Sequence, residues 1–397
     1  MSKALENIRI IDLTRVLAGP YCTMILADLG AEVIKVEIPK KGDDSRSFGP
    51  YQNGESRYFA NINRNKKGIS LNLKSPKGKE LFLRLIDNAD IVVENYRPDV
   101  MDRLGLGYEV LSKRNPRLIY GSISGFGHYG PNSAHPGYDI IAQATSGIMS
   151  LTGWPGQEPT RVGIALGDIL GGMFLSIGIL AAINARNITG RGQQIDIALV
   201  DSAVAALETM TQHYFVTGEQ PPRMGNRYVA AYPYDSFAAS DGNFIIGCAN
   251  QKLYVDLCIK VMKRPDLVAD SRFATLEDRN KNHAVLKSII EEWSKNYTTD
   301  KVVQMILESG VPAAKINYIK DIVNDPHIAG AREMFVELHH PIIGNMKVNG
   351  CAIKLSDTKP VIDRPAPVLG QDNNEIYHNQ LGLSNEEITS LIADGII

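Results

Sequence analysis

The chain of 397 residues carries 42 Lys and Arg against 44 Asp and Glu, which gives a formal net charge of -2. Hydrophobic residues make up 44% and charged residues 22%, a composition typical of an ordered globular protein with a sizeable core. The near-neutral charge balance offers no general attraction for nucleic acid or an anionic membrane. We therefore expect neither as a partner, and any bound anion should occupy a local pocket.

The cysteines and the apolar segments predict the compartment. The four cysteines are scattered, without a CxxC pair or a histidine at ligand spacing, so we expect buried, reduced thiols. The first residues lack the apolar run of a signal peptide. The uncharged segment 169–183 is about five residues too short to span a membrane and contains glycines, which favours a buried helix. Together these features predict a cytoplasmic protein.

The first half of the chain alternates short apolar runs with helical patterns. This alternation predicts a parallel sheet covered by helices, which binds ligands beyond the carboxyl ends of its strands. We expect strands at 8–13, 32–36, 91–93, 118–123 and 194–199, and helices at 20–29, from 75 and from 201.

The second half predicts a smaller domain and a return to the first. A polar, proline-containing stretch at 218–225 suggests a boundary, the run 237–246 resembles a hairpin, and 347–355 is typical of a strand. Ser384 with Glu387 forms a capping box that begins a final helix. We expect a large domain at 1–200, a linker at 201–228, a small α+β domain at 229–318, a second linker at 319–345, and a C-terminal part of the large domain at 346–397.

Asp168 is the most suggestive single residue. It ends the run RVGIALGD at 161–168 and immediately precedes the apolar segment. A carboxylate at the start of a helix faces free backbone N–H groups and the positive end of the helix dipole, which favour its ionised form. An ionised carboxylate in a dry site can attack a thioester. The alternative interpretation is a simple N-cap.

Basic residues form a second group. Charge-assisted donors on loops at one end of a sheet would bind phosphate, and the alternative is a solvated charged face. The group comprises Arg64, Lys66, Lys67, Lys74, Arg97 and Arg103. The turn at 14–20 is neither GxGxxG nor a P-loop, so no NAD site is indicated, and no HExxH, GxSxG or acidic triad indicates a metal site.

Several ordered motifs together resemble the class III CoA-transferases, the family of formyl-CoA transferase and carnitine CoA-transferase. The resemblance covers essentially the whole chain. The motifs are DLTRVLAGP at 12–20, LGAEVIKVE at 29–37, ENYRP at 94–98, GIALGD at 163–168, GRGQ at 190–193 and GNR at 225–227.

This resemblance implies an α/β fold in which both chain ends form a large domain with a Rossmann-like parallel sheet, joined to a smaller α+β domain. It implies an interlocked homodimer, with coenzyme A or acyl-CoA and a carboxylate as substrates and no metal. Asp168 matches the family's nucleophilic aspartate, which would carry CoA as an aspartyl thioester. The positions that match the family's CoA contacts are Val16, Leu17, Ala18, Lys74, Asn95, Tyr96, Arg103 and Tyr138.

Two departures narrow the expected activity. Leu17 stands where formyl-CoA transferases carry a glutamine, and RMGNR at 223–227 replaces their run of glycines. Backbone N–H groups, such as those near Ala18 and Gly19, or another side chain would then stabilise the oxyanion. The segments GDDSR at 42–46, FGPY at 48–51 and SGFGH at 124–128 are shared with bacterial acetyl-CoA:oxalate CoA-transferases. We expect transfer from acetyl-, formyl- or succinyl-CoA to a short dicarboxylate such as oxalate.

Two alternatives remain. An α-methylacyl-CoA racemase of the same family needs bases on both faces of the α-carbon, but Tyr138 replaces its histidine and Asn250 its acid. The other alternative is a CoA-binding scaffold without catalysis, in which Asp168 only caps a helix. Arg15 and Arg227 are candidates for pairing a second carboxylate of the acceptor.

Overall fold

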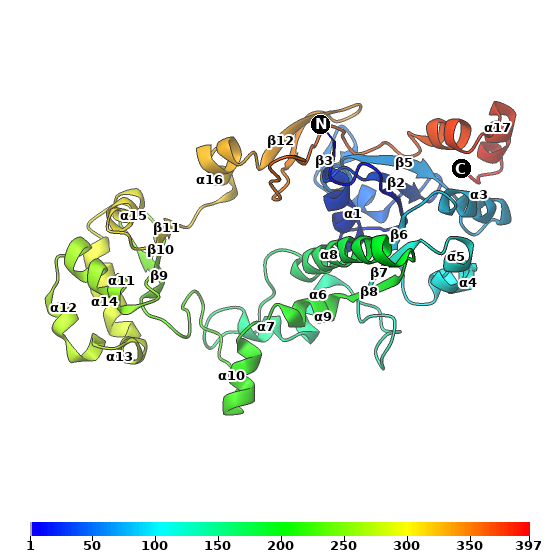
Figure 1. Cartoon of the computed structure of the whole chain (residues 1–397). Coiled ribbons are helices and arrows are strands. Elements are labelled where there is room, and N and C mark those ends of the chain that lie inside the picture. Colours follow the sequence, from blue (N-terminus) through cyan, green and yellow to red (C-terminus); the bar gives the residue numbers. More distant parts are fainter. Residues whose placement is uncertain (1) are drawn as a thin grey trace. The chain divides into compact units, whose positions relative to one another are not determined.

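The computed structural model describes residues 2–397, which fold into two compact units. The first unit comprises the residues up to 149, 161–219 and 326–397, and the second comprises 150–160 and 220–325. Both chain ends therefore belong to the first unit, which also holds the large parallel sheet (Figure 1). The α/β class and the shared use of both chain ends are as expected from the sequence.

Six strands of the first unit form one sheet, and every pair in it is parallel. Its strand order is β5-β2-β1-β6-β7-β8. In chain order this is the doubly wound arrangement 3-2-1-4-5-6, which reverses direction between its first and fourth strands and binds ligands there. The strands are β1 (Arg9–Asp12), β2 (Glu32–Glu37), β5 (Lys66–Ser70), β6 (Ile91–Glu94), β7 (Ile119–Ser124) and β8 (Gln194–Ala198).

Successive side chains of these strands enter two separate cores. Ile10 joins the core beneath helices α1 (Ala18–Asp28) and α8 (Leu166–Thr189), whereas Ile11 joins the core formed with α3 (Pro76–Ile86) and the C-terminal helices. This alternation buries both faces of the sheet. The helical segments of the first unit include α1 (Ala18–Asp28), η1 (Asp44–Ser47), α2 (Arg57–Ile62), α3 (Pro76–Ile86), α4 (Val100–Leu104), α5 (Tyr108–Arg114), α6 (Asp139–Thr145), α8 (Leu166–Thr189), α9 (Leu199–Ala205), α10 (Met210–Thr217), η4 (Pro326–Ala331), η5 (Glu375–Gln380) and α17 (Asn385–Ala393).

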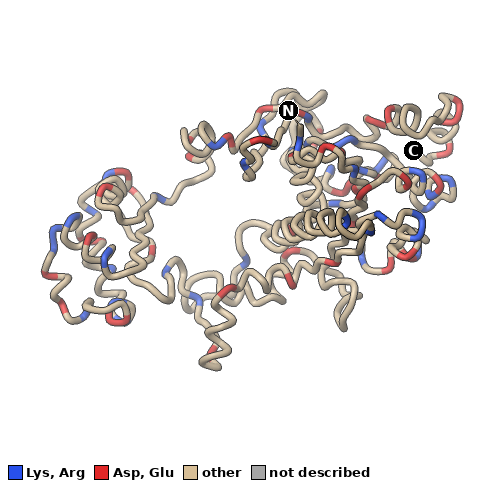
Figure 2. Tube along the Cα trace, viewed as in Figure 1, with Lys and Arg blue, Asp and Glu red and all other residues tan. Residues whose placement is uncertain are grey.

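Helix α8 is long and apolar enough, by length and composition, to cross a membrane. One face is buried against α1 and the sheet through residues such as Leu175 and Ile179. The other face exposes Met173, Phe174 and Ile177, and the helix bears almost no charge along its length (Figure 2). The packed face accounts for part of the apolar composition of α8, as in the core helix of a globular protein. The exposed apolar face of α8 has no partner within the described residues.

The second unit combines a three-stranded antiparallel sheet with a cluster of helices. The predicted hairpin is confirmed, because β9 and β10 pair antiparallel and β11 adds at the edge. Its elements are β9 (Tyr234–Ala238), β10 (Asn243–Gly247), β11 (Ala313–Lys315), α11 (Gln251–Asp256), η2 (Leu257–Val261), α12 (Asp266–Ala269), η3 (Ser271–Phe273), α13 (Leu276–Lys281), α14 (His283–Ser294), α15 (Thr299–Glu308) and α16 (Ile319–Ile322). Helix α7 (Ile148–Leu151) lies at the boundary of the units.

Two short hairpins complete the first unit. They pair β3 (Tyr51–Gln52) with β4 (Glu55–Ser56), and β12 (Phe335–His340) with β13 (Gly344–Asn349). Strand β12 lies in the segment 319–345, and helix α10 lies in 201–228, both of which we expected as linkers. The predicted final helix is confirmed, with the Ser384 side chain accepting from the Glu387 N–H and the Glu387 carboxylate accepting from the Ser384 N–H.

Candidate active site

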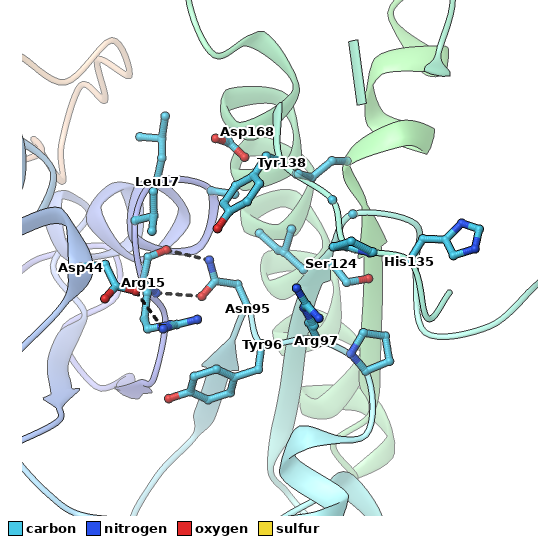
Figure 3. A pocket seen from close by; sticks show the side chains of 18 residues that line it. Arg15, Leu17, Asp44, Asn95, Tyr96, Arg97, Ser124, His135, Tyr138 and Asp168 are labelled. Carbon is cyan, nitrogen blue, oxygen red and sulfur yellow. Dashed lines mark hydrogen bonds and ion pairs between the residues drawn. The ribbon is translucent and has the colours of Figure 1, made fainter. Parts of the chain in front are cut away.

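A pocket of about 150 Å³ lies where the strand order of the large sheet reverses. Loops that follow β1, β6 and β7 at their carboxyl ends supply its walls, as the fold predicts. Figure 3 shows Asp168 and Leu17 toward one end of this pocket and Arg15, Tyr96 and Arg97 toward the other. The lining consists of residues 15–18, 95–98, 123–125 and 135–138 together with Asp44, Asp168 and Leu199.

Most of the residues expected from the family motifs converge on this pocket. Lys74 and Arg103 do not line it: Lys74 lies between β5 and α3, and Arg103 lies on the exposed side of α4. The residues that do line it are Val16, Leu17, Ala18, Asn95, Tyr96, Tyr138 and Asp168. Its volume is small compared with typical ligand pockets of about 300–1,000 Å³, so it can enclose only the reacting end of an acyl-CoA.

Asp168 lies in the first turn of α8 and is not its N-cap. The helix begins at Leu166 with Ala165 as the N-cap residue, and that residue makes no side-chain capping bond. The N–H of Gly167 is bound instead by Asp139 Oδ1 at 2.8 Å. The capping interpretation of Asp168 is therefore wrong, because a carboxylate 29 positions earlier in the chain satisfies that helix donor.

The electrostatic surroundings of Asp168 differ from those expected. Burial, with the negative charge of Asp139 as a second cause, raises the pKa of Asp168 to about 7. We expected the helix start to favour the ionised form, whereas burial and the neighbouring carboxylate shift the pKa in the opposite direction. A carboxylate with this pKa is a better nucleophile than an ordinary one, and half of it is ionised near neutral pH.

Glycines bring Asp168 close to the loop after β1. A Cβ on Gly172, one turn beyond Asp168, would lie 2.6 Å from the carbonyl oxygen of Ala18. A Cβ on Gly19 would lie 2.3 Å from the side chain of Thr14. The absence of a side chain at Gly172 lets α8 pack directly on the start of α1, and its absence at Gly19 lets the loop before α1 fold back against that helix. Asp168 is carried to the mouth of the pocket by this close approach.

Two members of the basic group, Arg64 and Lys66, have a structural role instead of forming a phosphate site. Arg64 is buried against Asp28, with a nitrogen-to-oxygen distance of 2.7 Å. Lys66 is fully buried and lies 3.0 Å from Asp12. The phosphate-site and solvated-surface interpretations are both wrong for these two residues, because carboxylates from distant segments neutralise them inside the protein.

Five polar lining residues were not among the expected contacts to CoA, namely Arg15, Asp44, Arg97, Ser124 and His135. Arg97 lies on the loop after β6, Ser124 ends β7, and His135 lies in the loop before α6. The hydroxyl of Ser124 is buried and has no hydrogen-bond partner within the described chain. Arg97 carried a signal in the sequence, since it belongs to the ENYRP motif, whereas nothing local marks Ser124 or His135.

The structure also gives the positions of the residues on which the racemase alternative and a metal site would depend. Tyr138 is 72% exposed, and the side chain of Asn250, in the second unit, accepts from the Leu253 N–H as the N-cap of α11. Within residues 2–397 no group of three or more His, Cys, Asp or Glu side chains is arranged to hold a metal ion. All four cysteines are unpaired, and Cys351 is only partly buried.

A doubly wound sheet with a partly buried aspartate in a pocket at its switch point has the arrangement of an α/β protein that binds its ligand there. The comparison with known families is specific: the model of CoA-transferase family III matches residues 5–373. The chain belongs to this family.

Characterised relatives cover nearly the full chain. An acetyl-CoA:oxalate CoA-transferase of Acetobacter aceti is 42% identical over 92% of this chain and 93% of its own length. A succinyl-CoA--D-citramalate CoA-transferase of Chloroflexus aurantiacus is 38% identical over 100% and 98%, and a succinyl-CoA:glutarate CoA-transferase of Mus musculus is 39% identical over 100% and 90%. The crystal structure of a CAIB/BAIF family protein from Brucella suis has a TM-score of 0.85 at 37% identity, covering 96% of this chain and 100% of the other. The protein is thus a CoA-transferase.

Proposed function

We propose that the protein transfers CoA from succinyl-CoA to a short dicarboxylate through an aspartyl-CoA thioester on Asp168. The observation that carries this proposal is the placement of Asp168, partly buried, with a pKa near 7, at one end of a pocket at the switch point of the sheet. Such a carboxylate is nucleophilic at neutral pH and shielded from water, which would hydrolyse its intermediates.

The reaction is a series of exchanges at carbonyl carbon. The Asp168 carboxylate attacks the thioester carbon of succinyl-CoA, which releases CoA thiolate and leaves a mixed anhydride. The thiolate attacks the Asp168 carbonyl carbon, so that succinate leaves and CoA remains on the enzyme as a thioester. The acceptor carboxylate then attacks this thioester, and the thiolate returns to the acceptor's acyl carbon to give the new acyl-CoA and free Asp168.

Each step passes through a tetrahedral oxyanion that needs hydrogen-bond donors. Helix α1 begins at Ala18, and its first N–H groups, those of Ala18 and Gly19, make no hydrogen bond within the described chain. Pro20 supplies no donor to compete with them. Ala18 lines the same pocket as Asp168. We assign oxyanion stabilisation to these two N–H groups, in place of the glutamine found in formyl-CoA transferases.

The choice of substrates rests on the relatives. Two of those described above use succinyl-CoA with a five-carbon dicarboxylate, whereas the oxalate enzyme uses acetyl-CoA. All of these acceptors carry a second carboxylate, so we propose a short dicarboxylate acceptor and keep oxalate within the class. The test is a matrix of succinyl-, acetyl- and formyl-CoA against oxalate, glutarate, citramalate, mesaconate, formate and acetate. Preference for a monocarboxylate, or turnover unaffected by Asp168→Ala, would contradict the proposal.

We further propose a homodimer in the cytoplasm. The apolar face of α8 and the exposed aromatic residues of α10, Tyr214 and Phe215, have no partner within residues 2–397. A second copy of the chain would cover such surfaces, and unpaired cysteines fit a reducing compartment. Light scattering after size-exclusion chromatography tests the assembly, and a monomer at micromolar concentration would contradict it.

Deuterium exchange at the α-carbon distinguishes the racemase alternative from CoA transfer. A racemase exchanges the α-hydrogen of its acyl-CoA with solvent, whereas the transfer above leaves it in place. The exposed position of Tyr138 and the capping role of Asn250 supply no pair of bases for that exchange. Incubation of 2-methylacyl-CoA in D₂O without an acceptor acid should therefore give no deuterated product.

A further inference from the structure

The loop between β1 and α1, residues 13–17, contains a residue in a conformation that its side chain disfavours. Val16 has a φ of 66°, in the left-handed region that β-branched residues rarely adopt. Such a conformation persists only where the surroundings fix it, and it is found where a site must be held in one shape. Val16 lines the pocket, two residues before the free N–H of Ala18.

One side of this loop is fixed by Asn95. Its Oδ1 accepts from the backbone N–H of Arg15 at 2.7 Å, and its Nδ2 donates to the backbone carbonyl of the same residue at 2.7 Å (Figure 3). The amide of Asn95 thus pairs with both backbone groups of Arg15, as a neighbouring strand would. This use of the amide differs from the contact to CoA that the family motif suggested for Asn95.

The other side of the loop is fixed by Asp43. Its Oδ1 accepts from the N–H of Val16 at 3.1 Å, and its Oδ2 lies 2.8 Å from Lys35 Nζ, in an ion pair that is almost fully buried. Burial opposes ionisation of Asp43, but the charge and hydrogen bond of Lys35 hold its pKa well below the usual range. The adjacent Asp44 pairs with the guanidinium of Arg15 at 2.9 Å. The loop is therefore fastened from two separate segments, 43–44 and 95.

We propose that Asn95 and Asp43 are positioning residues that hold the loop so that the free N–H groups of Ala18 and Gly19 face the reacting carbonyl. The assignment rests on the proposed function, because it concerns the oxyanion of that reaction. Neither residue needs to touch the substrate. Their substitution should slow the chemical steps more than it weakens the binding of free CoA, which has no carbonyl to stabilise.

Asn95→Ala provides the main test, with Asn115→Ala as the matched control. Asn115 also bonds backbone carbonyls through its amide, those of Ile86 and Ala89, but lies outside the pocket. We expect Asn95→Ala to lower kcat about 100-fold and to change the Kd of free CoA by less than about threefold. The control should leave kcat near that of the wild type. A weakened Kd with kcat retained would identify Asn95 as a CoA ligand and overturn the proposal, as would wild-type values of both.

Two further variants and a single-turnover measurement test the same proposal. Asn95→Asp keeps the acceptor for the Arg15 N–H but places a carboxylate oxygen, in place of the donor, opposite the Arg15 carbonyl. It should therefore lower kcat as well, and a wild-type kcat would contradict the positioning role. Asp43→Asn, which weakens the other fastening, should also lower kcat and spare CoA binding. The rate at which Asp168 is modified by succinyl-CoA in a single turnover separates the two claims. Slow modification in the variants supports positioning, wild-type rates overturn it, and no modification in the wild type overturns the proposed function itself.

Discussion

The Asp139 carboxylate accepts a hydrogen bond of 2.8 Å from the N–H of Gly167, the residue immediately before Asp168. Through this bond, Asp139 satisfies a donor at the start of α8 and brings a negative charge near the proposed nucleophile. That charge, added to burial, raises the pKa of Asp168 to about 7. Asp139 therefore links the position of the nucleophile to its reactivity.

The activity should depend on the ionisation of Asp168. Only the carboxylate attacks a thioester, so kcat/KM should fall as the pH is lowered through about 7. Asp139→Asn keeps an oxygen for the Gly167 N–H and removes the charge, which should move this inflection to lower pH by roughly half a unit to one unit. The measurement is a pH profile of kcat/KM for both proteins. An inflection that stays in place, or moves upward, would show that Asp139 does not tune Asp168.

The same pKa predicts a cost in stability at the active site. Since the folded-state pKa of Asp168 lies above its ordinary value of 3.8, the stabilisation it provides is present at low pH and is lost as the pH rises from about 4 to about 7. Asp168→Asn should then raise the free energy of unfolding at pH 8 by about 1–3 kcal/mol and have little effect at pH 4. Urea denaturation at both pH values checks this, with mass spectrometry to exclude deamidation. A variant less stable than the wild type at pH 8 would contradict the interpretation.

The raised pKa of Glu94 leads us to expect a second loss of stability with rising pH. This buried carboxyl ends β6, accepts from the N–H of Tyr96, and has a pKa raised to about 8 by burial. Its contribution is complete below about pH 4.5 and disappears as the pH rises through 8. Glu94→Gln should flatten the fall in unfolding free energy between pH 5 and 9 by about 4 kcal/mol, whereas Glu80→Gln on the surface of α3 should not change it. Equal pH dependence in all three proteins would argue against a protonated Glu94.

The contact between α1 and α8 should not tolerate a side chain at Gly172. Gly172→Ala places a methyl group 2.6 Å from the Ala18 carbonyl oxygen, so the helices must separate. We expect a loss of about 1–3 kcal/mol in stability and a fall in kcat, because Asp168 shares this helix. Gly330→Ala is the control, since nothing lies within 4 Å of its added Cβ. Wild-type kcat in Gly172→Ala would mean that the helix spacing does not position Asp168.

Much of the large sheet was predictable because its strands are short apolar runs separated by helices. Strand β5 was missed, since its first two residues, Lys66 and Lys67, favour a loop in any local view. Lys66 is accommodated only because Asp12, from a distant part of the chain, lies beside it. A lysine in a buried strand can be explained only once the fold places its carboxylate partner beside it.

The candidate site was predictable to a similar extent. The family motifs identified Asp168 and the loops around Val16 and Tyr138, all of which line the pocket. The raised pKa of Asp168 and the internal use of the Asn95 amide were not predictable. Each depends on a partner, Asp139 or Arg15, that only the tertiary structure places beside it.

The central claim is that Asp168 carries CoA covalently during transfer. Its most direct test is to incubate the protein with succinyl-CoA, trap the aspartyl-CoA thioester with hydroxylamine, and analyse the peptide containing residue 168 by mass spectrometry. We predict a hydroxamate on Asp168 that depends on succinyl-CoA and is absent from Asp168→Ala, which should still bind free CoA. An unmodified Asp168 in an enzyme that turns over, or a modification at another residue, would contradict the account.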